Sequence, residues 1–345
     1  MINLNNLDDN EKVFLNEFKI YSSNLVTAQS AESLDVVKSN YLNLINEYKN
    51  LLDQAVKLVK ISDSNQLKLR KAQTILQQQN SKIEFQNAEL QKSNDVQQKL
   101  LNVINRELSR AADYVMSILP EPLDLPDKGI QIDWKFQPSS KLGGDLFGYR
   151  YLDDSNLAIY LLDVCGHGVQ SALYSVSVIN TINYSNIPKA DFYNPESVFC
   201  ELNRIYDMRK HNDLYFTMWY GVYNLNSRTL HYSSAGHPPA VLVSDDNRVK
   251  LLEADNFFIG GVSDYNFESK IINLGKGDNL FIFSDGVYEI RKNENTYMDI
   301  KELMNFLRDE DLNNCPLENL YDFISRINFD KMLEDDFSIM QIKIK

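Results

Sequence analysis

The first third of the chain carries a helical pattern with one apolar stripe. From residue 34 to residue 90 the stripe positions alternate three and four residues apart, which is the heptad spacing of a coiled coil. Two successive steps of four through Asn94 interrupt this register, a stutter that locally unwinds a supercoil, and the stripe resumes after Gln97. The stripe consists of Leu34, Val37, Tyr41, Leu44, Tyr48, Leu51, Ala55, Leu58, Ser62, Asn65, Leu69, Ala72, Leu76, Gln79, Ile83, Gln86, Leu90, Asn94, Gln97, Leu101, Ile104, Leu108, Ala111, Val115 and Ile118.

Glycine and proline divide the chain into two parts. Neither occurs in residues 1–119, whereas all 13 glycines and 9 prolines lie from Pro120 onward. Because these residues interrupt helices most strongly, the first part is predicted to be entirely helical. A single helix over residues 33–118 would be roughly 130 Å long. We therefore expect residues 1–62 to form an N-terminal helical regulatory bundle, with a first helix near residues 10–28, and residues 63–119 to form a coiled-coil linker for dimerisation and signalling.

The middle of the stripe is polar. Gln79, Gln86, Asn94 and Gln97 fall on core positions, where polar residues lower the stability of a coiled coil and fix its register and oligomeric state. Two interpretations stay open. The stripe is either a weak dimer interface or a metastable linker, whose packing changes when the N-terminal bundle receives a signal or a regulatory protein.

Beyond Pro120 the pattern changes to short apolar alternations separated by turn residues. This pattern predicts an α+β domain over residues 120–345, a β-sandwich flanked by helices, because the strands cluster around pairs of consecutive helices. Predicted strands cover residues 131–137, 145–152, 157–163, 215–224, 229–235, 239–244, 248–252, 270–274, 279–284 and 337–344, and predicted helices cover residues 169–182, 195–208, 299–308 and 316–327.

Charge and composition narrow the class of protein. The net charge of -13 repels phosphate backbones and anionic membranes, so nucleic acid is not expected as a partner. The three cysteines are widely spaced, which argues against disulfides and thiolate zinc sites and fits a reducing compartment. No run of about 18 apolar residues occurs, and the N-terminus is acidic, so we expect no membrane span and a cytoplasmic location.

Aspartates next to glycines or at strand ends are the candidate chemistry. Asp145, Asp163, Asp285 and the pair Asp335-Asp336 each adjoin an apolar strand, so each can lie at a sheet rim. Such oxygen-rich sites suit Mg²⁺ and Mn²⁺, and two ions about 3.5–4 Å apart can activate a bridging water for attack on phosphorus. Glycine lets the backbone approach an ion closely, so a carbonyl such as that of Val164 can become a further ligand.

The ordered motif set resembles the SpoIIE/RsbU-like branch of the PPM family, bacterial metal-dependent serine/threonine protein phosphatases. The resemblance covers about residues 105–345. It rests on Gly143-Gly144-Asp145, Asp163-Val164-Cys165-Gly166-His167-Gly168, Phe216-Thr217-Met218, Ala235-Gly236-His237-Pro238-Pro239, Ser284-Asp285-Gly286-Val287 with Glu289, and Asp335-Asp336-Phe337-Ser338.

The resemblance implies a ligand set and a substrate. Asp145, Asp163, Asp285 and Asp335 would be the catalytic residues and would hold two Mn²⁺ or Mg²⁺ ions, together with the Val164 carbonyl. The substrate would be a phosphorylated anti-sigma-factor antagonist of the STAS type, as in partner-switching signal transduction. Independently of the resemblance, the heptad stripe predicts a homodimer through the helical arm.

Supporting roles are expected for Gly144, His167, His237 and Asp336. Asp336 stands where the family usually has a neighbouring polar residue. His167 is interpreted as a turn residue that supports the aspartate loop, not as a metal ligand, and His237 as structural.

Two departures from the family pattern concern metal ligands. Gly148 stands where the branch commonly has a second aspartate, so an auxiliary carboxylate is missing. His237 stands where eukaryotic relatives have an acidic residue, so a carboxylate that could bind a third metal ion is missing there.

Cys165 is not expected to be a catalytic nucleophile. The arginine loop that follows the cysteine in a cysteine phosphatase is missing, so we interpret Cys165 as a small buried apolar residue.

Two other functions were compared with the phosphatase. Gly143-Gly144-Asp145-Leu146-Phe147 superficially resembles the GGDEF signature of diguanylate cyclases, but its glutamate is replaced by Leu146. A catalytically inactive phosphatase-like scaffold is the other alternative. The four intact aspartates argue against it.

Overall fold

The computed structural model describes residues 19–20, 22–23, 26, 34–184, 187, 189–312 and 314–345. These residues belong to two compact units, Met1–Lys99 and Leu100–Lys345, which are treated separately below. Most of the helix expected near residues 10–28 lies outside the described residues.

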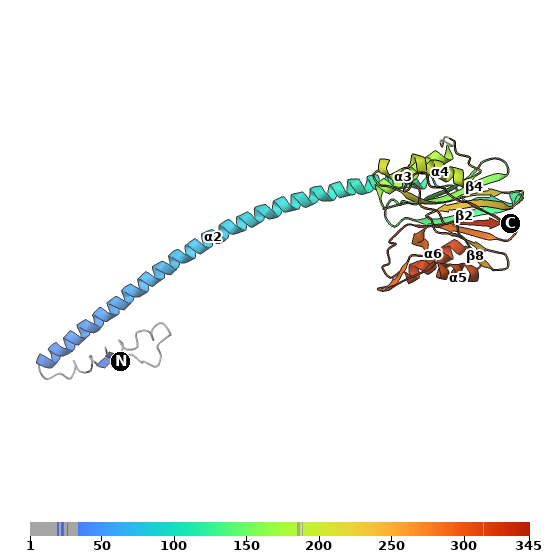
Figure 1. Cartoon of the computed structure of the whole chain (residues 1–345). Helices are drawn as coiled ribbons and strands as arrows, with labels where there is room; N and C mark the ends of the chain where they lie inside the picture. Colours follow the sequence, from blue (N-terminus) through green and yellow to red (C-terminus); the bar gives the residue numbers. More distant parts are fainter. Residues whose placement is uncertain are drawn as a thin grey trace. The chain divides into compact units, whose positions relative to one another are not determined.

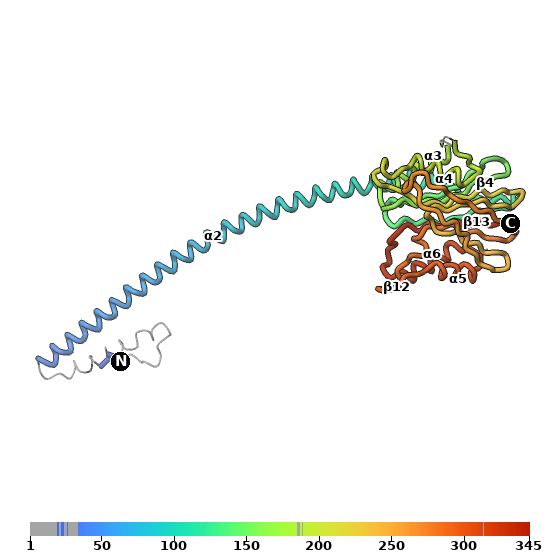
Figure 2. Tube along the Cα trace, in the orientation of Figure 1, coloured from blue at the N-terminus to red at the C-terminus, as the bar shows by residue number. Residues whose placement is uncertain are grey.

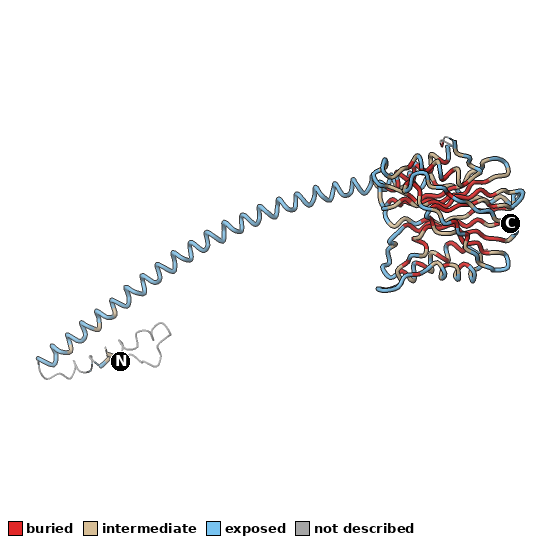
Figure 3. The backbone as a smooth tube through the Cα atoms, viewed as in Figure 1, coloured by how far each residue is buried: buried red, intermediate tan, exposed pale blue. Residues whose placement is uncertain are grey.

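One continuous helix, α2 (Leu34–Met116), carries the predicted heptad stripe (Figure 1). It passes residues 62 and 63 without a break, and the assignment of residues 1–62 to a bundle stays a prediction. In this single chain most of the stripe is exposed, as Figure 3 shows by the pale blue of the helix, with Leu76 57% and Leu90 61% exposed, whereas Val115 near its end is buried. A helix gains most of its stability by burying its apolar stripe, and the dimer that would bury this one stays a prediction.

Two antiparallel sheets form the second unit. The six-stranded sheet has the order β1 (Leu123–Leu125), β2 (Ile130–Gln137), β13 (Phe337–Ile344), β10 (Asn279–Phe283), β7 (Ala240–Val243) and β8 (Val249–Leu252). The five-stranded sheet has the order β3 (Leu146–Tyr151), β4 (Asn156–Val164), β5 (Phe216–Asn224), β6 (Thr229–Ala235) and β9 (Lys270–Asn273). The C-terminal strand β13 lies inside the first sheet (Figure 2), paired with β2 on one side and β10 on the other.

Helices cover the outer face of each sheet (Figure 1). Helices α3 (Val169–Asn183) and α4 (Pro195–Ile205) pack on the five-stranded sheet, and α5 (Ile300–Asp309) and α6 (Pro316–Ile327) pack on the six-stranded sheet. Short elements join them: the 3-10 helices η3 (Pro126–Lys128), η4 (Met208–Lys210) and η5 (Asp285–Val287), and the hairpin of β11 (Arg291–Asn293) and β12 (Thr296–Tyr297). The predicted α+β sandwich flanked by helices is confirmed.

The alternation of side chains along each strand explains how the two sheets pack against each other and against the helices on their outer faces. On β13, Phe337 and Ile339 face the core under α5 and α6, whereas Met340 and Ile342 face the core between the sheets. Successive side chains of a strand point to opposite faces, so a central strand with two buried faces is apolar at nearly every position. The buried residues therefore fill the layer between the sheets and the layers under the helices, as the red segments of Figure 3 show.

The elements differ from the predicted ones mainly at short strands and at one helix end. Strands β1, β11 and β12 were not predicted, because two or three residues are too few to show an alternation. The helix predicted over residues 195–208 ends at Ile205. The Asp207 side chain accepts a hydrogen bond from Arg209 N and so begins η4 in place of a further turn of α4.

In the part of the chain that the structure describes, no helix is both long and apolar enough to cross a membrane.

Replacing a core isoleucine should cost far more stability than replacing a surface one. Ile132 is 0% exposed on β2, and Ile271 is 67% exposed on β9. Ile132→Ala should lower the free energy of unfolding by about 2–5 kcal/mol through lost burial and a cavity, and Ile271→Ala by less than about 0.5 kcal/mol. Denaturant titration of both full-length variants measures the difference. Equal losses would contradict this placement of the core.

Candidate metal centre

Strand register brings the predicted carboxylates to one end of the sandwich. Leu146 of β3 pairs with Leu162 of β4, so Asp145, just before β3, lies beside Asp163 at the end of β4. In the other sheet Phe283 pairs with Ile339, so residues 284 and 285 after β10 adjoin residues 335 and 336 before β13. Antiparallel pairing thus brings two acidic segments together within each sheet.

Asp336 ties the two sheets together at this end. Its carboxylate accepts hydrogen bonds from Ser139 N at 2.8 Å, from Ser139 Oγ at 3.0 Å and from Asp145 N at 3.3 Å. The Ser338 hydroxyl, from the same strand, donates to the Asp145 carboxylate. The loop that carries Asp145 is therefore held by β13 of the opposite sheet.

Glycine is needed where these loops approach each other. A Cβ at Gly144 would lie 2.8 Å from the Val164 carbonyl oxygen, and a Cβ at Gly286 would lie 2.2 Å from the Asp336 carbonyl oxygen. Both distances are well below van der Waals contact. The absence of side chains at these two positions allows the acidic loops to pack directly against each other.

The electrostatics of the cluster are those of several carboxylates held close together. Burial, followed by the charges of Asp163 and Asp336, raises the pKa of Asp145 well above its usual value. Burial and the charges of Asp285 and Asp335 raise the pKa of Asp163 to about 7, although a hydrogen bond with Asp145 opposes the shift.

The other two carboxyls shift in the same direction. Partial burial and the charge of Glu289 raise the pKa of Asp285, and partial burial of the Asp335 carboxyl raises its pKa, with the charge of Asp285 adding to the shift. A raised pKa means that ionising these groups at neutral pH costs free energy, and a bound cation removes that cost.

The donor set fits a hard divalent cation. All of the clustered donors are oxygens, which Mg²⁺ and Mn²⁺ prefer. Asp285 Oδ1 is buried without a hydrogen-bond partner, as expected of an atom whose partner is an ion. Over residues 34–345, apart from the few not described, no group of three or more His, Cys, Asp or Glu side chains is arranged to hold an ion as it stands. The assignment of individual ligands is therefore a proposal.

The two histidines of the motifs differ in environment. His167 is exposed, and its charge lowers the pKa of Asp335, which places it near the cluster. His237 is 6% exposed, its Nδ1 lies 2.8 Å from Thr217 Oγ1, and Thr217 pairs with Asp163 across the sheet. Burial lowers the pKa of His237 to about 3, with the backbone of Phe283 partly opposing the shift, so the ring is neutral at physiological pH.

Packing accounts for Gly148, where the family commonly has an aspartate. Gly148 pairs with Tyr160 across β3 and β4, and a Cβ there would lie 2.6 Å from the Tyr160 hydroxyl oxygen. No side chain fits at this position beside Tyr160.

Cys165 corrects an expectation. It is only partly exposed, but it is not a simple apolar residue, because its sulfur accepts a hydrogen bond from Tyr215 N at 3.3 Å. This contact joins the Asp163 loop to the start of β5.

Sequence reasoning missed three residues that hold the Asp145 loop. The motif that contains Ser338 indicates a role for the aspartates beside it, and Ser139 lies in no motif. Lys141 Nζ donates to Asn105 O of α2 at 3.0 Å. A lysine in a polar loop looks like any solvent-exposed lysine, so only the folded chain reveals this contact.

Comparison with solved structures defines the class of fold. The SiaA-PP2C domain of Pseudomonas aeruginosa superposes with a TM-score of 0.58 at 19% identity, covering 71% of this chain and 98% of that one. The PP2C phosphatase domain of SpoIIE from Bacillus subtilis, with a fragment of its regulatory domain, gives a TM-score of 0.55 at 18% identity, covering 62% and 63%. The fold is that of the PP2C, or PPM, phosphatases.

Sequence comparison then gives the family. The stage II sporulation protein E (SpoIIE) family matches residues 153–345, more than half of the chain, and the chain belongs to this family. Phosphoserine phosphatase RsbU of Bacillus subtilis (strain 168) is 28% identical over 247 residues, 70% of this chain and 71% of RsbU. Phosphoserine phosphatase RsbP of the same organism is 33% identical over 197 residues, 56% of this chain and 47% of RsbP.

The family and these relatives identify the chain as a protein serine/threonine phosphatase of the PPM type, a class of metal-dependent enzymes. Asp163, Asp285, Asp335 and Asp336 lie within the matched residues, and Asp145 lies before them.

A methyl group at Gly286 should disturb the centre. Gly286→Ala forces the Asp285 loop away from Asp336, and a displacement of about 1 Å near reacting groups can lower a rate on the order of a hundredfold. Gly275→Ala is the matched control, because its nearest neighbour would be the Asp278 carboxylate at 3.4 Å, an ordinary contact. Steady-state hydrolysis of an aryl phosphate measures both. Full activity of Gly286→Ala would contradict the close packing of these loops.

Proposed function

We propose that this enzyme hydrolyses phosphoserine or phosphothreonine of a protein substrate with two Mn²⁺ or Mg²⁺ ions held by Asp145, Asp163, Asp285 and Asp335, with the Val164 carbonyl as a further ligand. The observation that carries this proposal is the convergence of acidic loops from both sheets, with raised pKa values at all four aspartates. When bound, the ions supply a water of lowered pKa and positive charge for the phosphoryl group.

The remaining residues of the centre hold these ligands in place. Asp336 binds the backbone of the Asp145 loop, and Ser338 orients the Asp145 carboxyl. Neutral His237 fixes Thr217 next to Asp163 without adding charge to the site. Preorganised ligands of this kind avoid the cost of reorganising the site during reaction.

The proposed substrate is a phosphorylated anti-sigma-factor antagonist of the STAS type, with the reaction in the cytoplasm. Support comes from the similarity to RsbU and RsbP, both phosphoserine phosphatases. The alternative, a catalytically inactive scaffold, is disfavoured because all four carboxylates are present and clustered.

Loss of a ligand carboxylate should abolish metal-dependent hydrolysis. Asp163→Asn and Asp285→Asn should each lower the hydrolysis of an aryl phosphate with Mn²⁺ by on the order of a hundredfold or more. Asp322→Asn, an exposed aspartate on α6, is the control and should keep full activity.

Binding itself gives a second measurement. Mn²⁺ should raise the midpoint of thermal unfolding of the wild type, because a cation that binds only the folded state stabilises it, and should raise that of the Asn variants much less. Metal-independent hydrolysis, or equal stabilisation of all variants, would overturn the ligand set. No hydrolysis by the wild type with Mn²⁺ would leave the inactive scaffold as the better explanation.

Regulation is proposed to act through α2, as a homodimer that responds to a signal or protein bound near the N-terminus. The last turns of α2 contact the phosphatase domain directly: Val115 is buried, and Leu108 and Ala112 pack on the core. Lys141 Nζ reaches Asn105 O and lies 3.4 Å from Ser109 Oγ, so the Asp145 loop is bonded to this helix. A change in α2 packing can therefore reach a proposed metal ligand.

Removing the arm should change catalysis. A chain lacking residues 1–100 should differ from the full chain in turnover or in Mn²⁺ affinity, and in its monomer–dimer equilibrium, because the exposed stripe of α2 is lost. Lys141→Ala in the full chain should alter Mn²⁺ affinity without altering dimerisation. Kinetics and sedimentation that are unchanged by the deletion would refute this regulatory role.

A further inference from the structure

A partly exposed aromatic surface adjoins the metal centre. It consists of Tyr215, Phe257, Phe258 and Val262, and is called the aromatic rim below. Phe257 is 41% exposed and Val262 is 44% exposed. The ring of Phe258 lies 4.2 Å from that of Tyr215 and 4.2 Å from that of Phe257, so the three rings pack against one another in a row.

The aromatic rim is attached to the loops that carry the ligands. Tyr215 O accepts a hydrogen bond from Cys165 N at 3.1 Å, two residues from Asp163. Phe216 and Ile259 exchange backbone hydrogen bonds at 3.2 and 2.9 Å, and Gly236 N donates to Asn256 O at 2.9 Å. The segment 256–259 is therefore held by β5 and by the end of β6.

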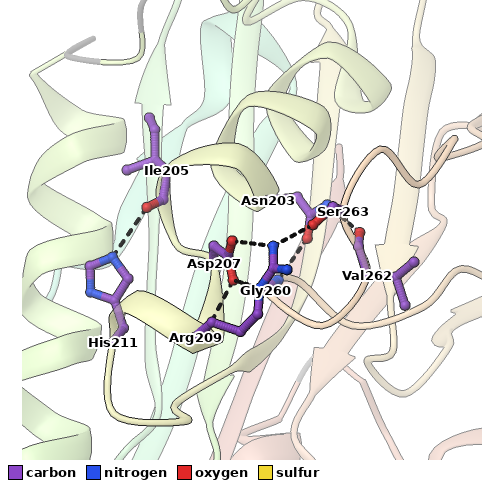
Figure 4. Close-up of polar contacts among 8 residues, drawn as sticks. All are labelled: Asn203, Ile205, Asp207, Arg209, His211, Gly260, Val262 and Ser263. Carbon is purple, nitrogen blue, oxygen red and sulfur yellow. Dashed lines mark hydrogen bonds and ion pairs between the residues drawn. The ribbon is translucent and has the colours of Figure 1, made fainter.

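The segment that follows is held from its other side by α4 and η4 (Figure 4). Asn203, which is 7% exposed, accepts from Gly260 N and donates to Val262 O, both at 2.8 Å. Arg209 is paired with Asp207 and donates to Ser263 Oγ at 2.7 Å.

Because hydrogen bonds hold this segment from two sides, the aromatic rim stays exposed in the folded protein. A buried amide that satisfies two backbone atoms of a loop fixes its conformation. Exposed aromatic side chains on a fixed loop lose little entropy on binding and are typical anchors of interfaces.

We propose that the aromatic rim binds apolar side chains next to the phosphorylated residue of the protein substrate. This inference rests on the proposed function and names a specificity determinant for it. The occupant follows from continuity: a phosphoserine that reaches Asp163 is part of a polypeptide, and the Cys165–Tyr215 contact places the rim directly beside that loop. The enzyme would therefore select phosphoserines flanked by apolar residues, and this selectivity would come from contacts that do not involve the phosphate.

Two phosphoserine peptides of equal length test this selection. One carries leucine and valine on both sides of the phosphoserine, and the other carries serine and asparagine at the same positions. With the full-length enzyme and Mn²⁺, kcat/KM should favour the apolar peptide by roughly tenfold, the size of effect expected of an aromatic anchor. Phe257→Ser and Val262→Ser should each reduce this ratio towards one. Ile271→Ser, which also replaces an exposed apolar side chain but on β9, should leave this ratio unchanged.

The possible outcomes separate this inference from the proposed function. Hydrolysis of both peptides at equal kcat/KM by the wild type would overturn the aromatic rim and leave the phosphatase chemistry standing. A ratio that Phe257→Ser and Val262→Ser leave intact would overturn it as well. A shift of the sedimentation coefficient in Phe257→Ser with an unchanged peptide ratio would assign the rim to contacts between copies of the chain. No hydrolysis of either peptide or of an aryl phosphate would overturn both proposals.

Discussion

Mutual repulsion among aspartates at one end of the sandwich is the constraint on which this domain depends. Burial and like charges raise the pKa values of Asp145, Asp163, Asp285 and Asp335, so the cluster destabilises the fold unless protons or cations neutralise it. The surrounding structure opposes this repulsion through the paired strands that adjoin these residues, and through hydrogen bonds to Asp336. The packing of the core thus offsets the repulsion among these like charges. A cation site requires such closely spaced carboxylates.

The rigidity of the six-stranded sheet makes this possible. Its central strands are buried on both faces, against the second sheet and against α5 and α6, so a shift of β13 would disturb two cores at once. Asp336 lies just before that strand and holds the Asp145 loop of the other sheet. The same loop is bonded through Lys141 to the last turns of α2. One short segment thus connects the chemistry with the element proposed to carry the signal.

Recognition and catalysis use neighbouring parts of the five-stranded sheet. Asp163 lies near the end of β4. Tyr215, a member of the aromatic rim, lies just before β5, and Thr217 of β5 contacts His237. Both proposed functions therefore depend on the same strand ends. The aromatic rim is nevertheless built from residues other than the proposed ion ligands, so specificity can vary while the carboxylates stay fixed.

The sequence by itself determined the elements and the chemistry. Alternation, turn residues and the absence of glycine before residue 120 predicted the longer strands and helices, and the acidic motifs at strand ends indicated a metal-dependent phosphatase, because these signals are local. Only the tertiary structure decided which groups meet. Asp336 contacts Ser139 from a segment distant in sequence, and the exposure of Phe257 depends on where its segment lies in the fold. The Tyr160 ring that would clash with a side chain at Gly148 belongs to the next strand of the same hairpin, and only strand pairing brings the two residues together. Such pairings are set by register and burial, and a local pattern carries no information about either.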